Sequence, residues 1–192
     1  MKNYSQNDEQ EVILKYFGDF KGRFLDIGAY NGVDLSNTWA LLELGWQGTF
    51  IEPNPFNLVD LIKNVEPFAD RAEVICAGVF SPSLRTLHLD RSPGRGWGAS
   101  FTTVNPPIDP SPLTVCVPCI GSMFGGMADM ISIDAEGDDL HVLAVLADQY
   151  YLKHCKLLVI EAQDRPQTYK AFEDYGFSVH HETPENIIAV RR

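Results

Sequence analysis

A glycine-rich turn beside an acid follows the first strand-like run of the chain. Asp26 lies near the end of the apolar run 23–27, Gly28 follows it, and Gly32 comes four residues later. Glycines here permit a tight turn and let the backbone approach a ligand closely. Twenty residues after Gly32, Glu52 ends the next strand-like run, where nucleoside-binding sheets place the acid that bonds a ribose diol. Together these residues predict a site for an adenosine-containing cofactor.

The spacing of this turn distinguishes two classes of cofactor. The dinucleotide fingerprint G-x-G-x-x-G brings backbone amides onto a pyrophosphate, whereas this chain has D-x-G-x-x-x-G, with Asp26 beside the turn. A carboxylate there would repel a pyrophosphate and could bind an ammonium group. S-adenosylmethionine carries an ammonium, a carboxylate, a ribose diol and an adenine but no phosphate. The pattern therefore favours S-adenosylmethionine, with a nicotinamide-dependent oxidoreductase on a similar sheet as the alternative enzyme.

Further carboxylates follow two later strand-like runs. Asp134 and Glu136 come after the fourth run, and Glu161 and Asp164 after the fifth. Clustered carboxylates raise one another's proton affinity, which suits a general base, and they could equally hold a divalent cation. We take Glu136 as the first candidate for the catalytic base and Asp134 as the second. His141, one helical turn further on, is the third, and no metal site is predicted.

The elements that position these residues alternate between strand and helix. Strands are predicted at 23–27, 48–52, 72–79, 130–134 and 156–161, helices at 8–17, 36–44, 56–65, 140–151 and 168–175, and a terminal hairpin at 177–179 and 187–190. Alternation with near-continuous apolar strands predicts an α/β fold with helices on both faces. We expect a doubly wound, mostly parallel seven-stranded sheet with a terminal antiparallel hairpin. Ligands bind such sheets beyond the carboxyl ends of the strands.

Length and composition narrow the class of protein. A chain of 192 residues buries about 70% of its unfolded surface, enough for a single domain over residues 1–192. The net charge of −11 disfavours nucleic acids and anionic membranes as partners. No apolar stretch is long enough to predict a membrane span. The polar start lacks the apolar core of a secretory signal, so we expect a cytoplasmic protein.

The stretch from 81 to 118 interrupts the alternation. It holds seven of the twelve prolines, and so long a loop is usually functional or mobile. One interpretation is a lid over residues 92–101 that presents Trp97 to a substrate, and the other is an insertion with a hairpin of 85–89 against 101–104. Cys116 and Cys119 close the stretch in a strand-like run without a second pair of ligands, which favours packing over zinc binding.

The order and spacing of four segments resemble the FkbM family of methyltransferases. They are YSQ at 4–6, FLDIGAYNGVDLSNT at 24–38, LGWQGTFIEPNP at 44–55 and ISIDAEG at 131–137. The family is similar to other class I S-adenosylmethionine-dependent enzymes, which have a Rossmann-like fold. Its known members mostly methylate hydroxyl oxygens on sugars or natural products. The resemblance therefore implies an O-methyltransferase with a small-molecule or glycan acceptor, and a non-catalytic S-adenosylmethionine-binding protein is the alternative from another class.

The resemblance also implies where the cofactor lies. The turn would line its methionine end, Glu52 and Asn54 would lie at the ribose, and Gly78 and Val79 would face the adenine. The implied cofactor residues are Asp26, Gly28, Ala29, Asn31, Gly32, Ser36, Asn37, Glu52, Asn54, Gly78, Val79 and Asp134. After Gly137 the family commonly has histidine or alanine and then glutamate, but this chain has Asp138 and Asp139. This departure lies at the substrate end of the expected site.

Overall fold

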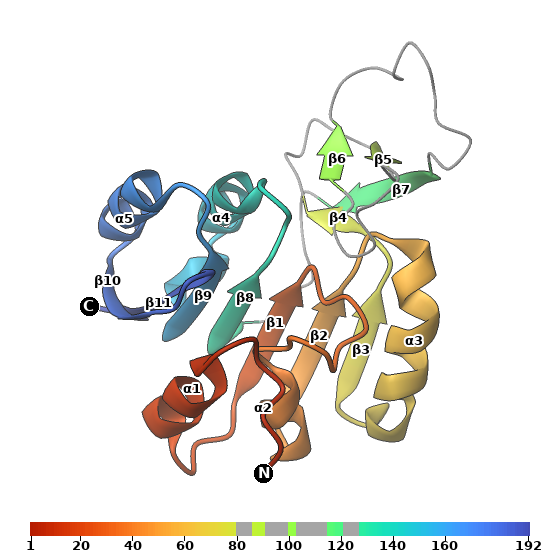
Figure 1. Cartoon of the computed structure of the whole chain (residues 1–192), viewed down its shortest axis with the longest axis horizontal. Helices are drawn as coiled ribbons and strands as arrows, with labels where there is room; N and C mark the ends of the chain where they lie inside the picture. Colours follow the sequence, from red (N-terminus) through yellow and green to blue (C-terminus); the bar gives the residue numbers. More distant parts are fainter. Residues whose placement is uncertain (80–85, 91–99, 103–114, 121–126) are drawn as a thin grey trace.

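A seven-stranded sheet forms the centre of the computed structural model, which describes residues 1–79, 86–90, 100–102, 115–120 and 127–192 (Figure 1). Its strands are β1 (Arg23–Ile27), β2 (Gln47–Ile51), β3 (Ala72–Ile75), β8 (Met130–Ile133), β9 (Leu157–Glu161), β10 (Phe177–Glu182) and β11 (Asn186–Arg191). Their order is β10-β11-β9-β8-β1-β2-β3. The five strands from β9 to β3 run parallel, and β11 is antiparallel to both β9 and β10. The predicted sheet with its terminal hairpin is confirmed.

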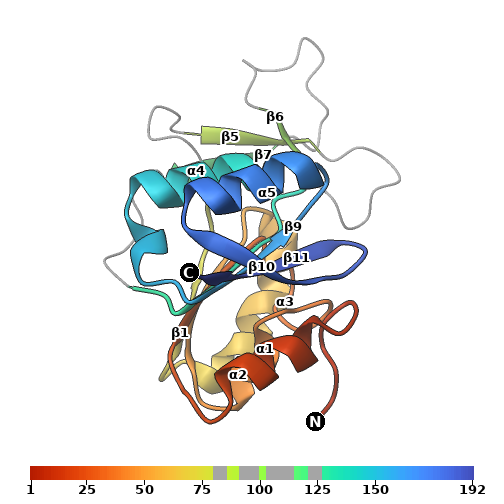
Figure 2. The same cartoon turned by 90° about the vertical axis from the view of Figure 1, so that its left-hand side faces the viewer.

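Helices cover both faces of this sheet, as Figure 2 shows. On one face lie α1 (Glu9–Phe17), α2 (Trp39–Glu43) and α3 (Pro55–Val65), and on the other lie α4 (Asp139–Asp148) and α5 (Arg165–Asp174). Two short 3-10 helices, η1 (Glu66–Phe68) and η2 (Tyr151–Lys153), follow α3 and α4. None of the helices in the described part of the chain is both long and apolar enough to cross a membrane.

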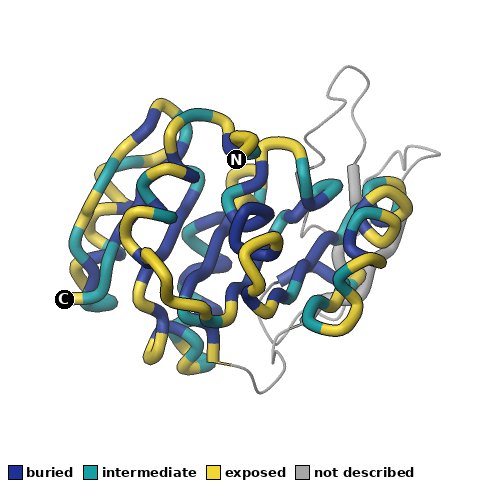
Figure 3. The backbone as a smooth tube through the Cα atoms, turned by 90° about the horizontal axis from the view of Figure 1, so that it is seen from below, coloured by how far each residue is buried: buried dark blue, intermediate teal, exposed yellow. Residues whose placement is uncertain are grey.

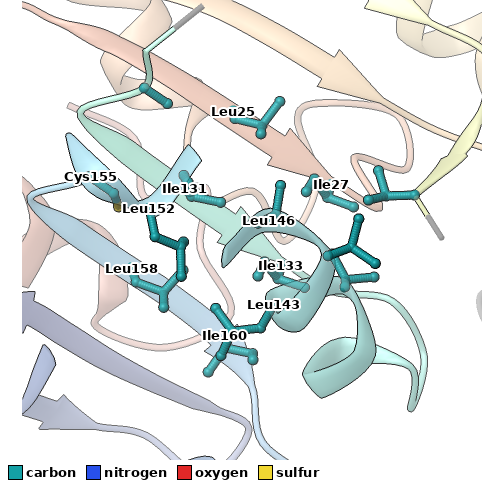
Figure 4. Packing of buried hydrophobic residues seen from close by; sticks show 14 of the residues in the cluster. Leu25, Ile27, Ile131, Ile133, Leu143, Leu146, Leu152, Cys155, Leu158 and Ile160 are labelled. Carbon is teal, nitrogen blue, oxygen red and sulfur yellow. The ribbon is translucent and has the colours of Figure 1, made fainter. Parts of the chain in front are cut away.

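Each face of the sheet has its own hydrophobic core. Because successive side chains of a strand point to opposite faces, Leu25 and Ile27 of β1 pack toward α4 and α5, while Phe24 packs toward α1, α2 and α3. Figure 4 shows the first core, where Leu143 and Leu146 of α4 lie over β1, β8 and β9. Figure 3 shows the buried strands at the centre and exposed residues on the outer turns. The two cores hold the strand ends in register.

Two of the differences from the predicted element boundaries lie beside the carboxyl ends of β1 and β3. The helix expected at 36–44 begins at Trp39, with Thr38 as its N-cap residue, and Ser36 lies in the preceding loop, where its hydroxyl accepts a hydrogen bond from the Trp39 amide at 3.0 Å. The strand expected at 72–79 ends at Ile75, and β4 (Gly78–Val79) pairs with β7 (Val115–Ile120) in a second sheet. Both differences lengthen the loops at the carboxyl edge of the main sheet.

The second sheet is built by the insertion and has the order β4-β7-β5-β6. β5 (Thr86–Asp90) runs antiparallel to β6 (Ser100–Thr102), in the stretch where one of the two interpretations placed a hairpin of 85–89 against 101–104. Cys116 and Cys119 belong to β7, in the strand that the sequence indicated. Residues 92–99 of the proposed lid, including Trp97, lie outside the described residues. The assignment of residues 1–192 to a single domain stays a prediction.

Candidate active site

A cavity opens at the carboxyl ends of β1, β2 and β8 of the main sheet and beside β4 of the second sheet. The arrowheads of β1, β2 and β8 mark these strand ends in Figure 1. This is where a doubly wound sheet binds its ligands. Most of the residues singled out from the sequence line it. They are Asp26, Gly28, Ala29, Ser36, Asn37, Glu52, Asn54, Gly78, Val79, Asp134 and Glu136. The strand ends therefore bring together side chains that are more than a hundred residues apart in the chain.

Glu52 connects two loops at the edge of the cavity through hydrogen bonds. Its carboxylate accepts hydrogen bonds from the Tyr30 amide at 2.8 Å and from the Asn54 amide at 2.7 Å. The side-chain amide of Asn57 donates to it at 3.3 Å. Burial raises the pKa of Glu52 to about 7, although these bonds oppose the rise. A carboxylate has about four acceptor positions, so Glu52 can accept one further hydrogen bond from a ligand.

Asp26 lies beneath the turn and has a single side-chain donor in the described structure. Thr38, which is fully buried, donates its hydroxyl to Asp26 at 2.6 Å. Burial raises the pKa of Asp26 to about 6, and the bond from Thr38 opposes this shift. The Asp26 carboxylate keeps acceptor positions for a cationic ligand.

Asp134 is surrounded by other carboxylates. Although solvent reaches its side chain through the cavity, the loss of surrounding water raises its pKa to about 8, and the negative charges of Glu161, Asp139 and Glu136 add to the rise. One carboxylate oxygen from each of Asp134, Asp139 and Glu161 lies within 4.8 Å of the others. These effects favour the protonated form of Asp134, and a ligand cation would favour release of that proton.

Asn37 and Ser132 add a polar pair to the cavity wall. The side-chain amide of Asn37 donates to the Ser132 hydroxyl at 3.3 Å, and both residues line the cavity. The Oδ1 atom of Asn37 is buried and has no hydrogen-bond partner within the described chain. A buried acceptor without a partner is costly, so this atom fits a ligand that donates a hydrogen bond.

Three residues other than glycine at the cavity have left-handed backbone conformations. They are Tyr30 (φ 50°), Leu35 (φ 58°) and Glu136 (φ 53°). Such conformations are costly for residues with a Cβ atom, and they cluster at functional sites where the surrounding structure holds them. The hydrogen bond from its backbone amide to the Glu52 carboxylate stabilises Tyr30 in this conformation. Sequence reasoning missed Tyr30, Leu35 and Ser132, since nothing in their residue types marks them.

Three of the proposed site residues do not line the cavity in the described part of the chain. Asn31, Gly32 and His141 are not among the described residues that line it. The Asn31 side chain accepts from the Val33 amide at 3.0 Å and stabilises its own loop. A Cβ atom at Gly32 would lie 2.7 Å from the side chain of Leu61, so this glycine serves helix packing.

The structure gives Gly28 and Asn54 structural roles besides their predicted places at the cofactor. A Cβ atom at Gly28, whose φ is +81°, would overlap the backbone carbonyl oxygen of Asp134. Gly28 is therefore required by the approach of β8 as well as by the turn. Asn54 accepts from the Phe56 amide at 3.0 Å and caps α3, so its side chain has a structural partner already.

A family model and several solved structures match this chain. A family model described as the methyltransferase FkbM domain matches residues 26–185. The crystal structure of methyltransferase FkbM from Methylobacillus flagellatus KT is similar, with a TM-score of 0.59 at 19% identity, over 88% of this chain and 43% of that one. The chain thus spans less than half the length of that protein. No curated protein matches the chain.

Two other solved structures show the same fold at lower identity. Precorrin-6y C5,15-methyltransferase from Geobacter metallireducens GS-15 has a TM-score of 0.53 at 16% identity, over 100% of this chain and 92% of that one. Magnesium protoporphyrin IX methyltransferase from Synechocystis PCC 6803, solved with bound SAM, has a TM-score of 0.55 at 10% identity, over 95% and 78%. The fold is that of Rossmann-like methyltransferases.

Proposed function

The chain belongs to the FkbM family of methyltransferases, and we propose that it transfers the methyl group of S-adenosylmethionine to a hydroxyl group of a sugar, glycan or natural product. The observation that carries the proposal is the convergence of Asp26, Glu52 and Asp134 on one cavity at the carboxyl ends of three strands. The O-methyl specificity follows from the family resemblance.

The charge of the cavity supports S-adenosylmethionine as the cofactor. Its described lining residues include Asp26, Asp34, Glu52, Asp134, Glu136 and Asp138 and no lysine or arginine. Such a lining would repel the pyrophosphate of a nicotinamide dinucleotide and attract an ammonium group. Asn37 Oδ1 and the remaining acceptor position of Glu52 suit hydrogen-bond donors of the ligand. Ala77, Gly78 and Val79 supply an apolar wall for an adenine.

The residues of the chain have separate roles in this proposal. When bound, S-adenosylmethionine supplies an electrophilic methyl group on a sulfonium. Asp26 and Asp134 bind its ammonium, and Glu52 accepts a hydrogen bond from a ribose hydroxyl. Glu136, at the cavity and exposed, accepts the proton of the acceptor hydroxyl on a carboxylate oxygen. These residues hold the acceptor oxygen in line with the methyl group, which is the main contribution of positioning.

Cofactor binding is tested by calorimetric titration with S-adenosylhomocysteine, NAD and NADP on separate samples. We expect saturable binding of S-adenosylhomocysteine alone. Binding of NAD or NADP instead would replace the proposal with an oxidoreductase. An acceptor screen with labelled S-adenosylmethionine, with and without magnesium, then separates an enzyme from a binding protein, since the latter would titrate but transfer no label.

The role of Glu136 is tested by Glu136→Gln, which keeps the shape of the side chain and removes the proton acceptor. Turnover should fall by about 10²–10⁴ at neutral pH, the usual contribution of a positioned base, while the affinity for S-adenosylhomocysteine stays within a few-fold. Glu173→Gln, an exposed change in α5, is the matched control. Parent-like turnover of Glu136→Gln would move the role to Asp134. Equal losses of turnover and affinity would make Glu136 part of the cofactor pocket.

A further inference from the structure

Asp139 is a buried acid that the proposed chemistry does not use directly. It is the first residue of α4, and 3% of its surface is exposed. Its two carboxylate oxygens accept hydrogen bonds from two amides of the preceding loop, from Ala135 at 2.7 Å and from Gly137 at 3.1 Å. One side chain therefore holds both ends of the peptide segment that contains Glu136.

The loop that Asp139 holds has a conformation that needs support. Glu136 has a φ of 53° and Gly137 a φ of 102°, so two consecutive residues lie in the left-handed region. For Glu136, which has a Cβ atom, this conformation is less favourable than the right-handed one. The bonds to Asp139 offset this cost because they satisfy amides that the left-handed turn directs toward α4. Without them the segment would relax toward more favourable backbone angles.

We propose that Asp139 is a positioning residue for the methyl-transfer site: its buried carboxylate fixes residues 135–137 so that Glu136 faces the cavity and Asp134 stays against the turn at Gly28. This inference rests on the proposed function for the roles of Glu136 and Asp134. The FkbM family commonly has glutamate at the position of Asp139, with a side chain longer by one methylene. The shorter side chain accepts from both amides in this chain.

Asp139 has a second effect, because its charge lies beside Asp134. The charged groups that face Asp134 are Glu161 at the end of β9, Asp139 on α4, Glu136 in the loop and Asp26 at the end of β1. All four raise the pKa of Asp134, after the larger effect of lost water. Neutralising Asp139 removes one of these charges, so it should lower the pKa of Asp134. An uncharged residue at this position would have no such effect.

The decisive variant is Asp139→Asn, with Asp148→Asn at the exposed far end of α4 as the matched control. The asparagine oxygen can still accept from one amide, but its NH₂ group cannot accept from the other. We expect faster hydrogen exchange at the amide of Ala135 or Gly137, turnover lower by about 10²-fold, and S-adenosylhomocysteine affinity within a few-fold at pH 8.5. In the parent, the affinity for S-adenosylhomocysteine should rise with pH as Asp134 loses its proton. In Asp139→Asn this rise should occur at a lower pH, because the pKa of Asp134 is lower. The control should match the parent in all four measurements.

Gly137→Ala disturbs the same loop while leaving the Asp139 carboxylate in place. Alanine is strained at a φ of +102°, and its Cβ atom would lie 3.3 Å from the Gln163 side chain. Turnover should fall, but the pH dependence of S-adenosylhomocysteine affinity should stay that of the parent. This variant also keeps the proposal testable if Asp139→Asn does not fold.

The outcomes separate this inference from the proposed function. Parent-like exchange at both amides in Asp139→Asn, or parent-like turnover in either loop variant, would overturn the positioning role. An unmoved pH dependence in Asp139→Asn would overturn the electrostatic role. If the parent itself transfers no methyl group, the proposed function fails, and the exchange rates of Ala135 and Gly137 still decide whether Asp139 holds the loop.

Discussion

Thr183 donates its hydroxyl to the carboxylate of Glu9 at 2.7 Å, across a sequence separation of 174 residues. Glu9 is fully buried at the start of α1 and also accepts from the Asn186 side chain at 3.0 Å and from the Asn7 amide at 2.7 Å. One carboxylate thus joins the beginning of the chain to the turn between β10 and β11.

Replacing Glu9 should therefore destabilise the fold. Glu9→Gln removes the charge and part of the acceptor capacity, so the free energy of unfolding should fall by about 1.5–3 kcal/mol, the range for hydrogen bonds to a charged group. Urea unfolding measures this, with the exposed Glu11→Gln in the same helix as control. Burial alone would raise the pKa of Glu9, but its hydrogen bonds lower it. The stabilisation by Glu9 should thus be lost as the pH falls through the lowered pKa. Equal unfolding midpoints for Glu9→Gln and Glu11→Gln would contradict the prediction.

Gly28→Ala should lower stability far more than the same change at a glycine of similar conformation. Gly28 and Gly176 have φ values of +81° and +78°. An alanine costs about 1–2 kcal/mol at either position for its backbone conformation alone. At Gly28 the new Cβ atom also overlaps the Asp134 carbonyl oxygen, whereas at Gly176 the nearest atom is the end of the Arg191 side chain at 3.5 Å. Thermal unfolding of the two variants compares the sites, and a Gly28→Ala melting temperature as high as that of Gly176→Ala would refute the packing argument.

Glu52→Gln should weaken binding of S-adenosylhomocysteine by about 10-fold to 100-fold, because a hydrogen bond to a charged group contributes about 1.5–3 kcal/mol. We choose glutamine because Glu52→Ala would also leave the Tyr30 and Asn54 amides without their acceptor. Calorimetric titration gives the affinity, and circular dichroism checks the fold. Glu73→Gln, on the exposed side of β3, is the control. Parent-like affinity in folded Glu52→Gln would remove Glu52 from the cofactor site.

The stability of the ligand-free protein should contain a component that falls as the pH rises from about 4 to 7. Burial raises the pKa of Asp26 to about 6 and that of Glu52 to about 7. Between the ordinary and the raised pKa values the native state binds more protons than the unfolded state, so stability decreases with pH. Urea unfolding at several pH values should show a shallower decrease for Asp26→Asn than for the parent. A parent-like slope in that variant would contradict the raised pKa of Asp26.

Periodicity predicted the strand ends, and with them the positions of Asp26, Glu52 and Asp134. Hydrophobic alternation determines which residues are buried, and the topology of a parallel sheet then brings the strand ends to one edge. The predicted start of α2 was wrong because residues 36–38 belong to the loop, where the Ser36 hydroxyl accepts a hydrogen bond from the Trp39 amide. The spacing of apolar residues does not mark that boundary.

The features that the sequence did not predict depend on contacts between distant segments. The run at 72–79 has strand propensity throughout, and only its pairing with β7 places Gly78 and Val79 in another sheet. Similarly, Asp139 has the residue type of a helix start, and its bonds to Ala135 and Gly137 appear only once the loop is folded. Local patterns carry no information on such partners.

The division between β3 and β4 has an evolutionary consequence. β4 lines the cavity with Gly78 and Val79 but is paired with β7 of the insertion. Changes in the insertion can therefore reshape one wall of the cavity without altering the pairing of β1, β2 and β8, which present the acids. Lineages that inherit this architecture are expected to keep the acids at the strand ends and to diversify in the molecules they accept through the length and composition of the insertion.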